Sequence, residues 1–230
     1  MHLELPLASG YLLGSLLLGI PYLLIYLTRP DLRQQLIWGG VACLPLALTA
    51  PFFIPEYWNP PYYFGDFGFV RLGIEDFIFS FFIGGIASSI YEFTFKKRLV
   101  KMPKNKTMAK DWKPYVGGIT FLVLMEVFFP QHSIISLALL GPLVAAYMIM
   151  CRSDLRTQSF AAGGLFMMFY FIFFTAFKTL FPSYVDVVYM KANLFDIYVK
   201  GVPIEELLFA FSVGCGWSIL YEYVVGYREK

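Results

Sequence analysis

The pattern of apolar and polar positions divides the chain into seven long apolar segments separated by short polar ones. A helix needs roughly 20 apolar residues to cross the hydrocarbon core of a bilayer. Segments that reach or approach this length are 8–27, 36–54, 74–95, 115–129, 132–151, 159–177 and 204–226. The segment 115–129 is the shortest and contains Glu126. The pattern therefore predicts an all-α membrane protein, a polytopic bundle of seven transmembrane helices.

The third and seventh apolar segments are related in sequence. Residues 74–93 align with residues 204–223 without a gap, and eight of the 20 positions are identical. The identities include an acidic residue near the start, a glycine and a Tyr-Glu pair: Glu75/Glu205, Gly84/Gly214, Tyr91/Tyr221 and Glu92/Glu222. The chain therefore reads as an internal repeat, with a first repeat at 1–95, a basic loop and a linker helix at 96–131, and a second repeat at 132–230.

Basic residues are concentrated on one side of the predicted helices. Of the 18 Lys and Arg residues, 14 follow the first, third, fifth or seventh apolar segment, and eight of these lie between Lys96 and Lys113. Positively charged loops stay on the cytoplasmic side of a membrane. This bias predicts an outside N-terminus, an inside C-terminus and two parallel three-helix repeats joined by a linker helix, a 3+1+3 arrangement.

Composition agrees with a multi-pass protein of the cell membrane. Hydrophobic residues make up 58% of the chain, charged residues 15%, and mean hydropathy is +0.64, which excludes an ordinary soluble domain. The net charge of +2 gives no indication of a nucleic-acid partner. Cys43, Cys151 and Cys215 are isolated, and His2 and His132 lack partner ligands, so neither a disulfide framework nor a metal centre is expected.

The N-terminal segment is expected to be a permanent anchor. It lacks the Lys or Arg flank and the small-residue cleavage site of a signal peptide.

Paired carboxylates open the third and seventh predicted helices. Glu75 and Asp76 lie at the start of one, and Glu205 and Glu206 at the start of the other. Carboxylates near the bilayer are costly and usually functional, although capping of a helix N-terminus is the simpler alternative. If the four groups converge at a pseudo-twofold axis, one acid could donate a proton while another acts as base.

Three further glutamates are expected to have roles different from those of the acidic pairs. Glu92 and Glu222 lie 17 residues beyond the first glutamates of the pairs, about 25 Å along a helix, and are expected to form interfacial ion pairs with Lys96 and Arg228. Glu126 lies inside the fourth helix and is either a proton relay or a partner in a helix–helix hydrogen bond.

Aromatic residues follow both acidic pairs. Phe79 and Phe209 lie four residues after the first glutamate of each pair, hence on the same helical face. Phe211 and Trp217 add aromatic surface nearby. Such stripes most often serve packing, but they could also bind a substrate and stabilise a carbocation by cation–π attraction.

These features resemble the lycopene cyclase domain family, small integral-membrane cyclases found as paired subunits or tandem fused domains. The run PIEE at 203–206 and the aromatics after it match the family pattern well, and GIED at 73–76 matches it in part. The resemblance implies conversion of the ψ ends of lycopene into β-ionone rings, an intramolecular lyase or isomerase reaction without net redox change. It implies that Glu205, Glu206, Glu75 and Asp76 are the acid and base groups.

The resemblance also implies a lipid-soluble carotenoid or isoprenoid substrate within the bilayer, and no cofactor is evident. Two other classes stay open, a small-molecule transporter of 3+1+3 architecture and a non-catalytic carotenoid-binding protein. A retinal-type photoreceptor needs a lysine midway along the seventh helix, and residues 204–226 contain none. The oligomeric state is not predicted.

Overall fold

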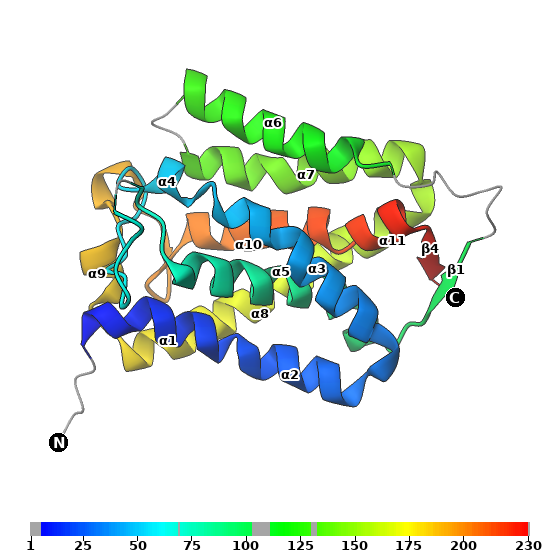
Figure 1. Ribbon diagram of the computed structural model, residues 1–230, viewed down its shortest axis with the longest axis horizontal. Helices are drawn as coiled ribbons and strands as arrows, with labels where there is room; N and C mark the ends of the chain where they lie inside the picture. Colours follow the sequence, from blue (N-terminus) through cyan, green and yellow to red (C-terminus); the bar gives the residue numbers. More distant parts are fainter. Residues whose placement is uncertain (1–5, 69, 103–110, 130–132, 230) are drawn as a thin grey trace.

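The computed structural model describes residues 6–68, 70–102, 111–129 and 133–229, and this part of the chain is mostly helical. Its long helices run side by side as a bundle (Figure 1). His2, His132 and the segment 103–110 of the predicted basic loop lie outside the described residues.

Among the described residues, five helical stretches are long and apolar enough to cross a membrane. They are Ala8–Thr28, Ile74–Phe95, Ser133–Cys151, Ser153–Leu180 and Ile204–Val225. The helices at the two other predicted positions are shorter: α3 (Arg33–Ala47) has 15 residues and α6 (Lys113–Phe128) has 16. The helical, membrane-type fold is confirmed, while the count of seven spans stays a prediction.

Prolines explain why two of the predicted helices are interrupted. The pieces are α1 (Gly10–Leu17) with α2 (Gly19–Thr28), and α3 with α4 (Ala50–Phe53). Proline has no backbone N–H to donate to the carbonyl four residues earlier. Pro21 therefore leaves the carbonyl of Leu17 without its helical partner, and Pro51 does the same to Ala47, so each helix breaks at these points.

The two repeats meet at the centre of the bundle. The central helices are α5 (Ile74–Phe95) and α10 (Ile204–Trp217), with α11 (Leu220–Val225) continuing α10. Helix α5 packs on α3, α10 packs on α7 (Ser133–Cys151) and α8 (Arg156–Leu180), and α5 contacts both α8 and α10. Helix α6 packs on α7 at the outer edge of the bundle (Figure 1).

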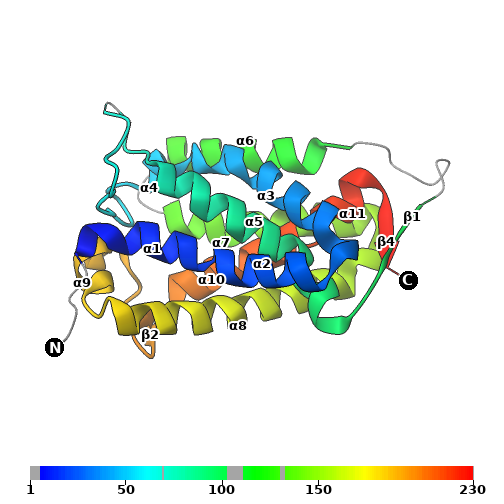
Figure 2. The ribbon, with the colours of Figure 1, turned by 60° about the horizontal axis from the view of Figure 1, so that its bottom comes forward.

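Short elements close the two ends of the bundle (Figure 2). At one end are α9 (Tyr184–Val188) and the hairpin of β2 (Tyr198–Val199) and β3 (Val202–Pro203). Its two-residue turn, Lys200 and Gly201, has positive φ at both positions, as such hairpins require. At the other end, β1 (Leu99–Lys101) pairs antiparallel with β4 (Tyr227–Glu229).

Single-turn 3₁₀ helices complete the described secondary structure: η1 (Leu7–Ser9), η2 (Pro30–Leu32), η5 (Ser153–Leu155) and η6 (Lys191–Asn193).

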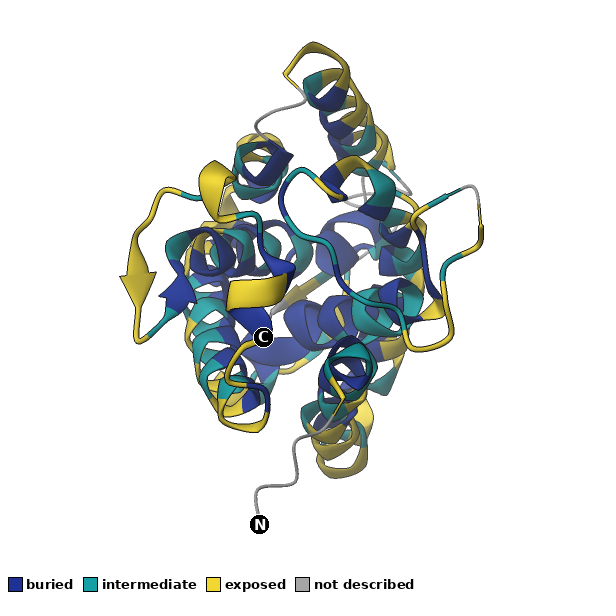
Figure 3. Ribbon diagram, turned by 90° about the vertical axis from the view of Figure 1, so that its left-hand side faces the viewer, coloured by how far each residue is buried: buried dark blue, intermediate teal, exposed yellow. Residues whose placement is uncertain are grey.

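The surface and the interior have the polarity of a membrane protein. Large apolar side chains such as Leu27, Met150 and Ile172 point outward from α2, α7 and α8, whereas carboxylates are buried between the helices. Figure 3 shows the buried residues gathered at the centre of the bundle and exposed ones at its periphery. An apolar exterior, with the ionisable side chains turned toward the inside of the bundle, is expected where lipid, not water, surrounds the protein.

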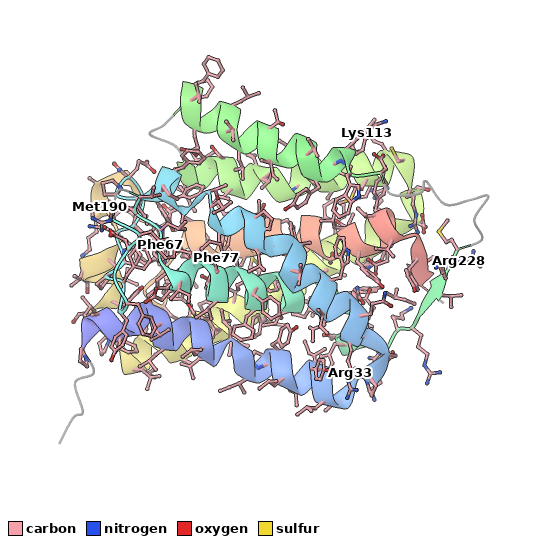
Figure 4. All side chains as sticks on the ribbon, in the orientation of Figure 1. Arg33, Phe67, Phe77, Lys113, Met190 and Arg228 are labelled. Atoms are coloured by element: carbon pink, nitrogen blue, oxygen red, sulfur yellow. The ribbon has the colours of Figure 1, made fainter. Side chains whose placement is uncertain are left out.

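Three basic residues that the charge bias predicts on one side of the membrane lie at the same end of the bundle (Figure 4). Arg33, Lys113 and Arg228 are at this end, and Phe67 and Met190 are at the opposite end, close to the starts of α5 and α10 (Figure 4). The side of the membrane that each end faces stays a prediction.

Candidate functional site

The four paired carboxylates lie in the first turns of α5 and α10, as the sequence predicts. Glu75 and Asp76 begin α5, and Glu205 and Glu206 begin α10. All four are buried. The Asp76 carboxylate also accepts a hydrogen bond from the backbone N–H of Gly73 at 2.8 Å, which caps the start of α5.

The structure separates the second acid of each pair from the first. A cavity of about 230 Å³ runs between the helices, and Asp76 and Glu206 both line it. They are the only charged side chains among the described residues that line it. Neither Glu75 nor Glu205 reaches this cavity.

Glu75 and Glu205 instead hold the preceding loops. The Oε1 atom of Glu75 accepts a hydrogen bond from the backbone N–H of Tyr63 at 2.8 Å. The Oε1 atom of Glu205 accepts one from the backbone N–H of Phe195. This arrangement fits the alternative of first-turn residues that fix the local backbone, and it distinguishes two kinds of carboxylate within each pair.

Two tyrosines hold Asp76. The Tyr11 hydroxyl donates to Oδ1 at 2.8 Å and the Tyr62 hydroxyl donates to Oδ2 at 2.8 Å. Tyr11 comes from α1, whereas Tyr62 comes from the loop before α5. The carboxylate is thereby fixed from two directions.

Tyrosine hydroxyls also hold Glu206, and Tyr189 is one of their sources. Tyr57, from the loop after α4, donates to Oε1 at 2.8 Å, and Tyr170, from α8, donates to Oε2 at 2.8 Å. Burial, and next the charge of Glu206, raise the pKa of Tyr57 well above its ordinary value. Burial and Asp76 likewise raise the pKa of Tyr62. Both phenols therefore stay neutral and can donate to the carboxylates.

Tyr184 lies within electrostatic reach of both Asp76 and Glu206. It lies in α9, is buried and lines the cavity. Its pKa is raised by burial and then by the charges of Glu206 and Asp76. One carboxylate from each half of the chain therefore faces the same end of the cavity.

The remaining cavity walls are mainly apolar and rich in aromatic rings. Three of the four aromatics predicted to bind substrate line the cavity: Phe79, Phe209 and Trp217. Phe211 does not; its ring packs against the buried cluster around Cys215. From Glu206 the lining extends along α10 and α11 as far as Leu220, roughly 21 Å at 1.5 Å per residue.

Additional aromatics of the cavity come from α8 and from the loop after α4. They include Trp58, Phe173, Phe174 and Phe177.

Glu126 lies apart from the cavity. Its side chain is buried on α6, and its Oε1 atom has no hydrogen-bond partner among the described residues. The titratable neighbour whose charge acts on it is Glu56, at the end of the bundle that holds the acidic pairs. A relay role for Glu126 stays a prediction.

The expectation for Glu92 and Glu222 is wrong. Within the described residues neither side chain forms an ion pair with Lys96 or Arg228. Both are buried, and Gln158 donates hydrogen bonds to both. Closeness in sequence to basic residues misled the prediction, because these positions of α5 and α11 face the other half of the bundle.

Sequence reasoning missed the partners of all these carboxylates. Tyr11 and Tyr170 lie within apolar segments, where a buried hydroxyl needs a hydrogen-bond partner. The glutamines belong to a second repeated pattern, Arg-x-Asp-Leu-Arg-x-Gln, at 29–35 and 152–158. Both signals are present in the sequence, but only the fold shows which carboxylate each one meets.

Comparison with known proteins gives one match. No curated protein and no solved structure matches the chain. The model of one protein family, described as Lycopene cyclase, matches residues 10–94 and 132–224, and each matched segment contains one of the acidic pairs. Because the two segments together cover more than half of its residues, the chain belongs to the lycopene cyclase family.

Proposed function

We propose that this protein is a carotenoid cyclase, which closes the end of a linear carotenoid into a ring by proton transfer and without net redox change. One observation carries the proposal. Asp76 and Glu206, one from each half of the chain, face a single cavity whose other walls are mainly apolar. Family membership supports the same general activity.

The reaction needs one acid and one base. A carboxylic acid gives its proton to the terminal double bond of the ψ end, and the resulting carbocation is attacked by an internal double bond, which forms the ring. A carboxylate then removes a proton from the ring carbon next to the new cation, which yields the ring double bond. One proton is added and one is lost, so no oxidant or reductant is consumed.

We assign the base to Asp76 and the acid to Glu206. Asp76 accepts three hydrogen bonds, from Tyr11, Tyr62 and the backbone of Gly73. Hydrogen bonds to a carboxylate favour its ionised form. Glu206 is held by the hydroxyls of Tyr57, Tyr170 and Tyr189, whereas Asp76 also accepts from a backbone N–H at the start of its helix, so Glu206 is the group proposed to carry the transferred proton.

The cavity walls suit a cationic intermediate. Aromatic faces attract a cation through their quadrupole, and Phe79, Phe209 and Trp217 line the space beyond the carboxylates. An apolar cavity also excludes water that would otherwise capture the carbocation. These residues are therefore proposed to hold the polyene and to protect the intermediate.

The membrane setting supports a substrate that enters from lipid. We propose that the bundle spans the cell membrane with seven helices in the 3+1+3 arrangement, with the acidic pairs on the outer side. Five described helices are long and apolar enough to span a membrane. A linear carotenoid dissolves in the hydrocarbon core of the bilayer that surrounds them.

Solvent deuterium provides the test of this chemistry. The purified protein is reconstituted in lipid vesicles with lycopene, in buffers made with H₂O or D₂O, and the pigments are analysed by mass spectrometry. The proposal expects cyclic products that are isomers of lycopene in H₂O and that gain deuterium in D₂O. Cyclic products without deuterium would refute the proposed proton-transfer mechanism. The absence of any cyclic product from folded protein would refute the proposed activity.

A further inference from the structure

A second group of buried titratable side chains lies at the opposite end of α5 and α11. The Nε2 atom of Gln158 donates to Oε1 of Glu92 at 2.7 Å and to Oε1 of Glu222 at 2.8 Å. The Nε2 atom of Gln35 faces the same two carboxyl groups at 3.3 Å each. All four side chains are almost completely buried. The group therefore joins the two halves of the chain.

Nearby basic side chains are already paired. Arg29 donates to the backbone carbonyl oxygen of Glu92 at 2.8 Å, and Arg152 donates to that of Glu222 at 2.8 Å. Each guanidinium also forms an ion pair with the aspartate two residues further along the chain. The two arginines thus cap the ends of α5 and α11. Each is ion-paired with its aspartate, and its positive charge also acts on the nearby buried glutamate without forming an ion pair with it.

The other groups facing the pair add no free positive charge. Besides Arg152, Tyr221 on α11 is a titratable group that interacts with Glu222. From α3 and α8 the groups in contact are the neutral amides of Gln35 and Gln158. The described surroundings therefore supply hydrogen bonds but no ion pair for Glu92 or Glu222.

Several buried oxygen atoms in this group have no partner. Among the described residues, Oε1 of Gln35, Oε2 of Glu222 and Oγ of Ser218 make no hydrogen bond. The carboxyl groups of Glu92 and Glu222 lie within hydrogen-bonding reach of each other. Two like charges this close in an apolar interior cannot both be accommodated, whereas one proton removes a charge and supplies the missing donor.

We propose that Glu92 and Glu222 form a proton-binding site, in which a carboxyl and a carboxylate share a single proton across the interface between the two halves of the bundle. The site is separate from the cavity, because neither glutamate lines it. Glu222 lies 16 residues from Glu206 along α10 and α11, roughly 24 Å at 1.5 Å per residue. The proposal does not depend on the cyclase activity.

A hollow lies next to this pair at the basic end of the bundle (Figure 4). It is lined by Asp154, Gln158 and Arg228, together with Met102 and Leu155. Gln158 thus lies between the hollow and both carboxyl groups. The shared proton exchanges with the aqueous phase at this end.

The shared proton makes stability depend on pH. Above about pH 4.3 glutamates in the unfolded chain are ionised, so the folded protein holds one proton more than the unfolded chain. Stability then falls as the pH rises, and the unfolding equilibrium constant increases by up to about tenfold per pH unit. The effect ends where the pair loses its proton in the folded state.

Melting curves test this dependence. Full-length protein in detergent is melted between about pH 5 and pH 9, with tryptophan fluorescence as the readout. Glu222→Gln keeps the shape and the hydrogen bonds of the site but removes the need for a shared proton. The expected result is a decline in melting temperature with pH in the wild type that is flatter in Glu222→Gln. The matched control Glu75→Gln alters a buried carboxyl at the other end of α5, retains an oxygen that can accept the Tyr63 hydrogen bond, and keeps the decline.

Equal pH dependence in wild type and Glu222→Gln would overturn the proposal. Infrared difference spectroscopy of the protein in lipid supplies a second measurement. The C=O band of a protonated carboxyl must disappear or shift in Glu92→Gln, or shift in Glu92→Asp if the glutamine variants do not fold. A band unaffected by every change at Glu92 contradicts the shared proton, whatever the cyclase assay shows.

Discussion

At the scale of single residues, the hydrogen-bond donors around each carboxylate show that the two acids of a pair have different surroundings, although the sequence gives no reason to tell them apart. Glu205 and Glu206 are neighbours, yet one binds a backbone N–H and the other faces the cavity with two tyrosine hydroxyls. The first turn of a helix points consecutive side chains in different directions. The sequence therefore predicts the four candidate acids, but their division into two kinds depends on which face of α10 meets the cavity.

Removal of one tyrosine hydroxyl is expected to weaken the reaction without abolishing it. Tyr170→Phe leaves Oε2 of Glu206 without its donor, and an unsatisfied buried acceptor costs about 1–3 kcal/mol. We expect the rate of cyclisation to fall by roughly tenfold to a hundredfold. Rates from reconstituted vesicles measure this, with Tyr147→Phe as the control because Tyr147 does not line the cavity. An unchanged rate in Tyr170→Phe contradicts the positioning of Glu206 by this hydroxyl.

The fall in cyclisation rate at alkaline pH is expected not to depend on titration of Tyr57 or Tyr62, the two tyrosines from loops. Burial raises the pKa of both Tyr57 and Tyr62 above the ordinary value of 10. As the pH rises they therefore keep their protons throughout the range below pH 10. A decline of activity in this range must therefore come from the titration of other groups. The pH at its midpoint is expected to be the same in Tyr62→Phe as in the wild type. A midpoint that moves in this variant would show that Tyr62 titrates.

At the scale of helices, close approach between α8 and α10 depends on one of two adjacent glycines. A Cβ atom at Gly163 would collide with Sγ of Cys215, whereas a Cβ at Gly164 has no atom within 4 Å. Apolar segments in the sequence predict both helices, but they do not show which glycine faces the neighbouring helix. The prolines show the same limit: Pro21 and Pro51 coincide with breaks, whereas Pro45 and Pro142 lie inside the continuous helices α3 and α7, so the missing N–H of proline does not by itself decide where a helix ends.

Adjacent alanine substitutions test this packing. Gly163→Ala is expected to lower stability by about 1–3 kcal/mol, because the added methyl group overpacks the interface. Gly164→Ala is expected to leave stability unchanged or to raise it by up to about 1 kcal/mol, since alanine favours the helix. Melting in detergent compares the two variants. Equal losses in both would contradict the α8–α10 packing.

At the scale of the whole molecule, two repeated sequence patterns form two polar centres. The acidic pairs open α5 and α10 beside the cavity, and the patterns at 29–35 and 152–158 bring their glutamines to Glu92 and Glu222 at the other end. Pattern and spacing predict the helical membrane fold and the location of the acidic pairs. Contacts between the two halves come only from the tertiary structure, which is why the ion pairs expected at Glu92 and Glu222 are wrong.

Thiol labelling tests the predicted orientation of the bundle. In a cysteine-free background, Phe67→Cys lies at the end with the acidic pairs and Lys113→Cys at the basic end (Figure 4). Both positions are exposed. A reagent that cannot cross the membrane is expected to label Phe67→Cys in intact bacterial cells and Lys113→Cys only after lysis. The reverse labelling pattern would show that the bundle has the opposite orientation in the membrane.

The central claim is that Asp76 and Glu206 together cyclise a carotenoid. The most direct measurement is chromatography of pigments from a bacterial host that accumulates lycopene and expresses the protein. The wild type should yield monocyclic or bicyclic carotenes, and Asp76→Asn and Glu206→Gln should lower their yield by about a hundredfold or more. Glu75→Gln and Glu205→Gln, which alter the carboxylates outside the cavity, should retain cyclic products. Unchanged lycopene with correctly inserted wild-type protein, or full activity in Glu206→Gln, would contradict the account.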